Sequence, residues 1–403
     1  MAHNILLTLN PGSSTIKLGL FAIQAGKCNA IGRGAIDLRH APLTLHIEGG
    51  ARSSEIEIEA AVTDDLHGVL DETLSRLTEH LAADTLVAVA HRVVHGGDRF
   101  TGPIAITDDT LAAIEALAPL APLHQPKSLQ LIHAVRHLRP DLPQTASFDT
   151  AFHRSQSDLV RRFALPRPLF DQGIKRYGFH GLSYKRIADR LAQSHPALAA
   201  GRVVVAHLGS GASLCGLDAG VSRDTSMSFS VLDGIPMATR CGALDPGVLL
   251  HLMKHEGMTA DAIEDMLYHQ SGLLGVSGIS ADTRELAESE APEAREALAL
   301  FALRTAREAA AIATTLGGVD AIVFTAGIGE HQPAVRAAIC GHLEWLGARL
   351  DPAANARHAA RIDAPDSRIA LLVMATDEEQ VIAEEACEIL YPHAPDPLPE
   401  PTP

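Results

Sequence analysis

Apolar and polar positions alternate on both sides of a short polar turn near the start of the chain. Residues 5–9 and 16–21 carry the alternation, and Asn10, Pro11 and Gly12 stand between them. A period of two is typical of strands, and proline and glycine favour the tight turn that joins two strands. The pattern therefore predicts a β-hairpin whose tip exposes backbone N–H groups.

The rest of the first half changes from strand periodicity to helix periodicity and back. Polar and apolar residues alternate first, and then leucines and valines recur at helical spacing. The predicted elements are antiparallel strands within residues 34–58, a helix over 62–83, a buried strand over 85–90, helices near 109–118 and 126–138, and a short strand over 144–149.

The pattern of the opening hairpin recurs in the second half. An apolar run at residues 203–208 leads into Gly209, Ser210 and Gly211 and then into a strand over 214–220. A third strand, over residues 321–325, also ends in a glycine turn. The remaining predicted elements are an alanine-rich helix over 294–316 with Glu/Arg pairs at helical spacing and an amphipathic helix over 378–390.

Chain length and the repeated hairpin together predict two domains. A chain of 403 residues exceeds the usual size of one domain. We expect the first domain at residues 1–150 plus 378–391 and the second at 151–377. Residues 392–403 carry proline at every second position from Pro395, which predicts a disordered tail.

Composition limits the partners and the compartment. Lys and Arg number 33 against 49 Asp and Glu, and the net charge of −16 argues against nucleic acid or an anionic membrane as partner. No stretch approaches the roughly 20 apolar residues of a membrane span, and no signal peptide is visible. The five cysteines form no CxxC pair, so we expect reduced thiols in a cytoplasmic protein, with neither a disulfide framework nor a zinc site.

The tip of the opening hairpin has the chemistry of a phosphate site. Asn10, Ser13, Thr15 and Lys17 offer an amide, hydroxyls and an ammonium beside exposed backbone N–H groups. The alternative interpretation is an ordinary polar hairpin. The matching turn at Gly209–Gly211 favours a pair of phosphate-binding hairpins.

Nine segments, in order along the chain, resemble the acetate kinase (acetokinase) family over about residues 4–391. They are NPGSSTIK (10–17), HRVVHGG (91–97), APLHQP (121–126), FDTAFH (148–153), RYGFHGLS (176–183), HLGSG (207–211), ATRCG (238–242), FTAGIGE (324–330) and DEE (377–379). The resemblance implies an α/β fold of two duplicated ribonuclease-H-like domains with a cleft between them, the actin-like ATPase fold of sugar kinases, actin and heat-shock ATPases.

The resemblance also implies catalytic roles. A carboxylate substrate needs a cation of fixed geometry, and the match assigns that role and the stabilisation of the transferring phosphoryl group to Arg92 and Arg240. The alternative for each arginine is a structural ion pair. His124 and His180 match hydrogen-bond donors near the phosphoryl group. Asp149 completes the catalytic set.

Further residues match the binding sites of the family, in which Mg²⁺ (replaceable by Mn²⁺) accompanies ATP or ADP and acetate or acetyl phosphate. Asn10, Asp149 and Glu378 match the metal side. The small acyl pocket matches Asn10, Arg92, Val94, Leu123, Phe179 and Val231. The nucleotide side matches Ser13, Thr15, Lys17, His207, Gly209, Ser210, Gly211, Asp282, Thr283, Arg284, Gly327, Ile328, Gly329 and His331.

Several positions depart from the family pattern. Ser210 replaces an asparagine of the second hairpin, Val231 a pocket proline, and Ala243 an acid. His331 stands where asparagine is usual, and Asp377 also replaces an asparagine. These changes leave the preferred acid and the phosphoryl donor open.

The hypotheses that follow belong to two classes. The first is an acetate kinase, with a propionate or other short-acid kinase and a pyrophosphate or other donor as its alternatives. The second is a nucleotide-dependent assembly protein like actin, which would not need an arginine pair for a carboxylate. We also expect a homodimer through the apolar surface of the helix over 294–316.

Overall fold

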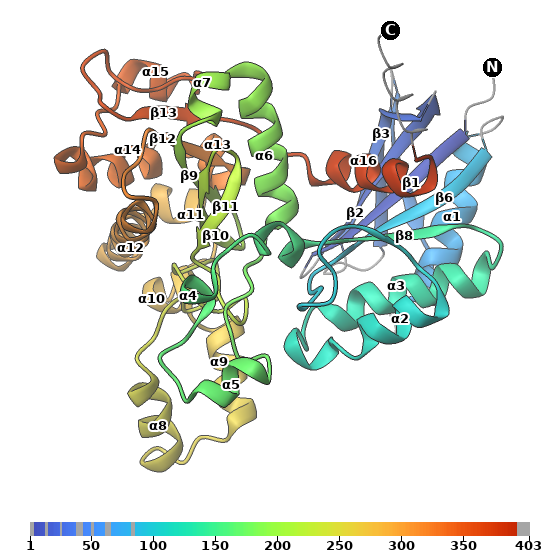
Figure 1. The fold of residues 1–403 in the computed structure, drawn as a ribbon, viewed down its shortest axis with the longest axis horizontal. Coiled ribbons are helices and arrows are strands. Elements are labelled where there is room, and N and C mark those ends of the chain that lie inside the picture. Colours follow the sequence, from blue (N-terminus) through green and yellow to red (C-terminus); the bar gives the residue numbers. More distant parts are fainter. Residues whose placement is uncertain are drawn as a thin grey trace, which may run out of the picture. The chain divides into compact units, whose positions relative to one another are not determined.

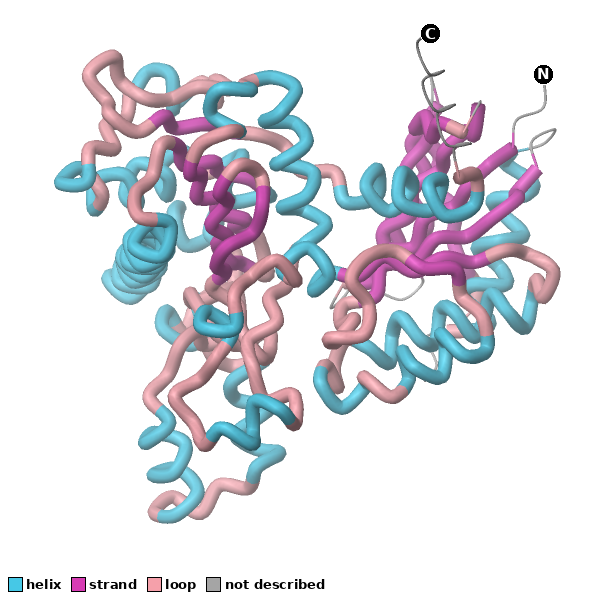
Figure 2. Tube along the Cα trace, viewed as in Figure 1, coloured by secondary structure: helices cyan, strands magenta, loops and turns pink. Residues whose placement is uncertain are grey.

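The computed structural model describes residues 4–12, 15–24, 26–37, 43–49, 52–60, 66–81 and 85–392. The chain divides into two compact units, Met1–Ala151 with Asp377–Pro403 and Phe152–Thr376 (Figure 1). Each unit is a sheet with helices packed on it (Figure 2). Most of the expected proline-rich tail lies outside the described residues.

The first unit is built on an eight-stranded sheet with the order β5-β4-β3-β2-β1-β6-β8-β7. The strands are β1 (Asn4–Pro11), β2 (Thr15–Gln24), β3 (Lys27–Asp37), β4 (Leu43–Gly49), β5 (Arg52–Ile58), β6 (Thr85–Val93), β7 (Ile104–Ala105) and β8 (Gln144–Phe148). The expected strands are confirmed, although β3 begins seven residues earlier than the alternation indicated. Strands β1 to β5 form an antiparallel meander, and β6 and β8 run parallel to β1.

The opening hairpin is confirmed as the pair β1–β2. Asn10 lies opposite Lys17, and the backbone N–H of Gly12 donates to the carbonyl of Thr15 at 2.7 Å. Because successive side chains of a strand point to opposite faces, Leu7 and Leu9 face one side and Asn10 the other. The two leucines belong to the buried aliphatic core.

Helices cover both faces of this sheet. They are α1 (His67–Leu81), α2 (Asp108–Glu115), the short η1 (Ala118–Leu120), α3 (Gln125–Leu138) and α16 (Glu378–Leu390). Leu70 of α1 and Leu131 of α3 share the core of Leu7 and Leu9. The last helix, α16, packs on the other face and contacts Asn10. The chain thus returns to its first strand at its end.

The second unit repeats the strand plan on a five-stranded sheet with the order β11-β10-β9-β12-β13. Its strands are β9 (Arg202–Leu208), β10 (Ala212–Asp218), β11 (Val221–Thr225), β12 (Ala321–Thr325) and β13 (Ala370–Val373). β9 and β10 form a hairpin, and β12 and β13 run parallel to β9. The order β3-β2-β1-β6-β8 of the first unit is the same plan, which confirms the predicted duplication.

The helices of the second unit are mostly absent from the sequence prediction. They are α4 (Asp158–Arg161), α5 (Arg167–Asp171), α6 (Gly181–Ser194), α7 (Pro196–Ala199), α8 (Pro246–Lys254), α9 (Ala260–His269), α10 (Gly272–Ser277), α11 (Thr283–Glu288), α12 (Pro292–Leu316), α13 (Ala326–His331), α14 (Pro333–His342), η3 (Glu344–Leu346) and α15 (Pro352–Ala356). The predicted long helix is α12. None of the helices in the described part of the chain has both the length and the apolar character needed to cross a membrane.

One expectation about the cysteines is wrong. Cys28 of β3 and Cys387 of α16 form a disulfide with a Cα–Cα distance of 6.8 Å. The two residues are 359 positions apart, and the packing of α16 against β3 brings them together. Cys215, Cys241 and Cys340 are free thiols.

Candidate active site

The first group of candidate residues is centred on a buried ion pair. Arg92 lies near the end of β6, and Asp149 follows the neighbouring parallel strand β8 and begins the short helix η2 (Asp149–His153). Parallel neighbours bring their carboxyl ends to one edge of the sheet. There Arg92 Nε donates to Asp149 Oδ1 at 3.0 Å, and Nη2 donates to Oδ2 at 2.6 Å. The side chain of Asp149 is 1% exposed and that of Arg92 is 12% exposed.

The ion pair extends to the opening hairpin and the last helix. Arg92 Nη1 donates to Asn10 Oδ1 and to the carbonyl of Pro11, each at 3.2 Å. Asn10 Nδ2 donates in turn to Glu378 Oε2 at 3.0 Å and to Glu379 Oε1 at 2.8 Å. Four of the predicted residues therefore form one hydrogen-bonded network. Glu379 belongs to the segment DEE (377–379), but sequence reasoning assigned it no role.

The charges of this network are unbalanced. Burial alone would lower the pKa of Arg92, but the charge and hydrogen bonds of Asp149 and the charges of Glu378 and Glu379 raise it. One guanidinium thus faces three carboxyl groups. Oxygen ligands with surplus negative charge suit Mg²⁺, which keeps several waters and is shared with phosphates. Among the residues that the structure describes, no group of three or more His, Cys, Asp or Glu could hold a metal alone.

A buried amide fixes the loop that carries Leu123 and His124. Gln125 Oε1 accepts from the backbone N–H of His95 at 3.1 Å, and Nε2 donates to the carbonyls of His95 and Ile114 at 3.0 and 3.3 Å. His124 precedes α3 as its N-cap residue and is half-buried. Leu123 is 37% exposed, whereas Val94 is buried. Sequence reasoning quoted Gln125 only as part of a motif.

The second group of candidate residues is centred on the hairpin β9–β10. His180 immediately precedes α6 with φ at +56°, and its Nδ1 lies 2.8 Å from Ser213 Oγ. The ring of His207 stacks on that of His180 with centroids 4.2 Å apart. His207 Nδ1 lies 2.8 Å from Ser183 Oγ. Both imidazoles are therefore held in one orientation by hydroxyl groups.

Arg240 approaches the backbone of this hairpin closely. A Cβ atom added at Gly211 would lie 2.7 Å from Arg240 Nη2 and 3.2 Å from His180 Nε2. Arg240 Nη1 donates to the carbonyl of Val231 at 2.9 Å. The absence of a side chain at Gly211 thus lets the guanidinium of Arg240 and the imidazole of His180 approach the same stretch of backbone.

The buried side chain of His153 fixes the backbone next to His180. His153 Nε2 lies 3.0 Å from the carbonyl of Phe179, which can only accept, so Nε2 carries the proton. Its Nδ1 then accepts from Ser222 Oγ at 2.9 Å. Burial lowers the pKa of His153 to about 4, so the ring is neutral. Gly178, with φ at +91°, leaves room for this ring, since an added Cβ would lie 2.6 Å from it. Sequence reasoning included His153 in the segment FDTAFH (148–153) but assigned it no role.

Two further segments of the second unit carry residues predicted to bind the nucleotide, and they lie at α11 and α13. Asp282 caps α11 and forms an ion pair with Arg284, whose side chain is 75% exposed, and Thr283 is buried between them. Gly327 and Ile328 lie in α13, and space is open around Gly327. A Cβ at Gly209 would lie 3.6 Å from that of Ala326, so the start of α13 adjoins the second hairpin.

The remaining predicted residues differ in how far they are exposed to solvent. Gly329 is buried, while Ser210 and His331 are exposed. In the first hairpin Thr15 is half-buried and Lys17 exposed, and Ser13 lies outside the described residues.

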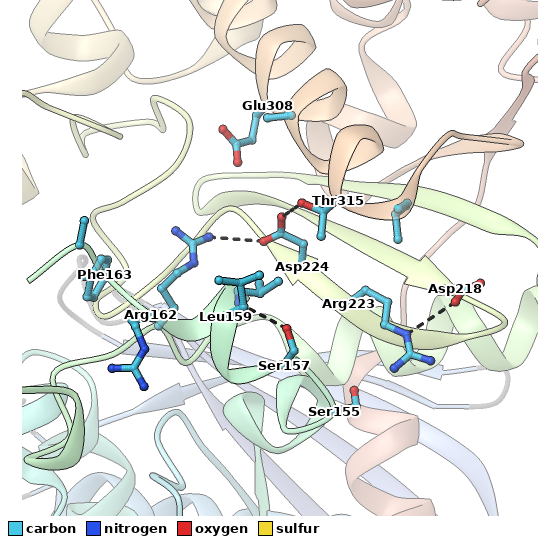
Figure 3. A pocket seen from close by; sticks show the side chains of 15 residues that line it. Ser155, Ser157, Leu159, Arg162, Phe163, Asp218, Arg223, Asp224, Glu308 and Thr315 are labelled. Carbon is cyan, nitrogen blue, oxygen red and sulfur yellow. Dashed lines mark hydrogen bonds and ion pairs between the residues drawn. The ribbon is translucent and has the colours of Figure 1, made fainter. Parts of the chain in front are cut away.

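A separate pocket of about 920 Å³ lies in the second unit (Figure 3). Its lining includes Arg162, Arg223, Asp224, Glu308 and Thr315. The Thr315 hydroxyl donates to Asp224 at 2.6 Å, as the dashed line in Figure 3 marks. None of the predicted site residues lines this pocket, so it is distinct from the two groups described above.

Comparisons with known proteins identify the family of the chain. The sequence matches the acetokinase family over residues 5–384. An acetate kinase of Rhodopseudomonas palustris is 48% identical over 94% of this chain and 97% of its own length, and one of Methylocella silvestris is 43% identical over 96% and 98%.

Two solved structures are also similar. A propionate kinase of Francisella tularensis has a TM-score of 0.86 and 34% identity over 95% of this chain and 98% of its own. The acetate kinase of Porphyromonas gingivalis has a TM-score of 0.84 and 32% identity over 96% and 100%. On the match across residues 5–384 and the identity of these relatives, the chain belongs to the acetokinase family.

Proposed function

We propose that this protein is an acetate kinase, which transfers a phosphoryl group reversibly between ATP and acetate. A carboxylate oxygen of acetate attacks the γ-phosphorus in line, and the bond from that phosphorus to the bridging oxygen of ADP breaks. The electron pair of that bond stays on ADP. Acetate is ionised at neutral pH, so the step needs no general base.

The observation that carries this proposal is the convergence of Arg240 and His180 on the backbone of Gly211. Phosphoryl transfer is catalysed mainly by positioning and by charge stabilisation, which calls for fixed donors rather than for a base. In this proposal Tyr184 donates to Ser213, and Ser213 donates to His180 Nδ1. His180 Nε2 then carries the proton on the side of the hairpin.

The carboxylates of the first unit fit a magnesium ion that arrives with the nucleotide. Asp149, Glu378 and Asn10 would hold Mg²⁺, with Glu379 beside them. When bound, the ion would neutralise charge on the phosphates. Arg92, fixed by Asp149, would supply positive charge at the same network.

Arg240→Ala tests the proposal. Loss of this charge should lower kcat by about 100-fold or more, measured as acyl phosphate trapped by hydroxylamine. Arg202→Ala is the matched control, because Arg202 pairs with Asp320 at the start of β9, at the opposite end of that strand from His207. A kcat of Arg240→Ala close to that of the control would contradict the role of Arg240. Acetate-stimulated formation of ADP by the wild type would exclude the actin-like alternative.

Propionate is the second candidate substrate. Val231 stands where the family has a proline, and its carbonyl is bound to Arg240. The similar structure from Francisella tularensis is named as a propionate kinase. Values of kcat/KM for acetate, propionate and butyrate decide between the acids. A value for propionate equal to that for acetate would overturn the acetate assignment.

The identity of the phosphoryl donor is tested by comparing turnover with ATP and with pyrophosphate. Ser210 offers one hydroxyl where an asparagine would offer an amide, and it is exposed at the hairpin. ATP should nevertheless be the donor, because the second glycine hairpin and α13, which the family resemblance assigns to the nucleotide, adjoin each other. Turnover with pyrophosphate that exceeds turnover with ATP would contradict this.

We further propose that the protein is a homodimer that pairs through α8. No residue of α8 is buried, although the helix is rich in leucine and valine. The large apolar side chains exposed on and near α8 are Leu244, Val248, Leu250 and Met253. By contrast α12, the helix that the sequence suggested, buries most of its apolar side chains and exposes Leu303. Light scattering should give twice the chain mass for the wild type and less for Leu250→Asp.

A further inference from the structure

Arg336 is a fully buried arginine without an acidic partner in the described part of the chain. It lies on α14, its side chain is 0% exposed, and it forms no ion pair with a described carboxylate. Burial lowers the pKa of its guanidinium. A buried charge without a counter-charge is costly, and an apolar side chain could fill the same space at lower cost. The guanidinium therefore needs another explanation.

The explanation lies in what its five N–H groups contact. Nη1 donates to the carbonyls of Gly329 and Glu330, both at 2.8 Å. Nε donates to Asn355 Oδ1 at 2.8 Å, and Nη2 donates to the carbonyl of Asn355 at 3.0 Å. The second N–H of Nη2 points towards His358 Nδ1 at 3.3 Å, and that nitrogen also lies 3.0 Å from the carbonyl of Glu330. A lysine has a single side-chain nitrogen, so it could not bind the carbonyls of α13 and the two oxygens of Asn355 at the same time.

The two carbonyls bound by Nη1 belong to the end of α13. The last carbonyls of a helix have no partner within it. Arg336 supplies partners for Gly329 and Glu330 and so caps α13. At the other end, Ala326 starts the helix with φ at +64°, a left-handed conformation that is strained for a residue with a side chain. The backbone of α13 is thus strained at its first residue and is held at its end by hydrogen bonds from Arg336.

Asn355 of α15 fixes the position of Arg336. Asn355 Nδ2 donates to the carbonyl of Pro333 at 2.8 Å, which ties α15 to the start of α14. Asn355 thus binds the guanidinium through two oxygens and the backbone of α14 through its nitrogen. The guanidinium has little freedom to follow a displaced α13.

We propose that Arg336 is a positioning residue for the nucleotide, because it fixes the segment that presents Gly327 and Ile328. This inference rests on the proposed function only in taking the ligand to be ATP or ADP. It assigns Arg336 no contact with the nucleotide. The prediction is a selective loss of nucleotide affinity when the clamp is removed.

The test compares Arg336→Lys and Arg336→Gln with the wild type. ADP dissociation constants come from calorimetry, and KM for ATP and for acetate come from steady-state kinetics. Both variants should raise the Kd for ADP by about tenfold or more, because small displacements of a binding segment are costly. KM for acetate should change less than twofold. Asn355→Ala should shift the Kd for ADP in the same direction.

Ile312→Ala is the control for a general loss of stability, since Ile312 is buried in the same unit against Gly216. If Arg336→Lys and this control lower Tm equally and also raise the Kd for ADP equally, the proposal is overturned. If neither Arg336 variant folds, Asn355→Ala decides by the same comparison. A wild type that binds ADP but does not phosphorylate acetate would refute the proposed function and leave this inference standing.

Discussion

Asp149 occupies both Nε and Nη2 of Arg92, and so the planar fork of this guanidinium is already paired with a carboxylate. Nη1 is the nitrogen that points to the opening hairpin, where it meets Asn10 and Pro11. A second bidentate carboxylate cannot use the same edge of the guanidinium. The structural ion pair expected as the alternative is therefore present, and in the proposed reaction we expect Arg92 to act on a substrate through its charge and through Nη1.

Asp149→Ala should destabilise the first unit strongly. It leaves the guanidinium of Arg92 buried without its main partner, which costs about 3–5 kcal/mol of unfolding free energy. Urea unfolding followed by circular dichroism measures the change. Asp320→Ala breaks a half-exposed pair with Arg202 and should cost much less. Equal losses in the two variants would show that burial of the Arg92 pair carries no extra stability.

Gly211→Ala should reduce turnover with little loss of stability. The new methyl group would lie 2.7 Å from Arg240 Nη2 and 3.2 Å from His180 Nε2, and both are ends of side chains that can move aside. Their displacement should lower kcat about 100-fold. Gly102→Ala, where no atom lies within 4 Å, is the control. Unchanged kcat in Gly211→Ala would mean that neither side chain needs its present position.

Thiol titration should detect the disulfide. In denaturant without reductant the protein should show three thiols, those of Cys215, Cys241 and Cys340, and after reduction it should show five. Reduction should also lower the unfolding free energy, by about 2–4 kcal/mol for a typical disulfide. Cys387→Ser should have the lower stability already and should not respond to reductant. Five thiols in the unreduced protein would contradict the bond.

Acid should destabilise the second unit through His153. Its pKa is lowered from 6.5 to about 4 by burial, so below pH 6.5 the unfolded chain binds a proton that the native protein does not. Stability from this residue is complete above pH 6.5 and is lost as the pH falls towards 4.

Between pH 7 and pH 5 the wild type should therefore lose about 2 kcal/mol more unfolding free energy than His153→Gln. Exposed His342→Gln should behave like the wild type. Parallel pH profiles for wild type and His153→Gln would refute the assignment.

The sequence allowed the hairpins to be predicted because their signals are local. Alternation with a period of two and glycine in the turn mark β1–β2 and β9–β10, and the apolar period of α16 predicts its bounds as the structure has them. The helix α8 was missed because none of its side chains is buried, so no apolar stripe marks one face. The early start of β3 was missed because most of its first residues are exposed and show no alternation.

The pattern of apolar and polar positions does not predict contacts between residues that are far apart in the sequence. Asn10 meets Glu378 across 368 positions, and Cys28 meets Cys387 across 359. The family resemblance assigned Asn10 and Glu378 to the metal side one by one. Their hydrogen bond could be seen only in the folded structure. His153 and Arg336 are polar residues whose importance comes from burial, which one sequence does not display.

The packing of α16 on the first sheet has a consequence for synthesis. Glu378 is translated 368 residues after Asn10, and Glu379 follows it directly. The first hairpin must therefore wait, without its acidic partners, until α16 has been translated. A product that terminates before α16 could not assemble this network.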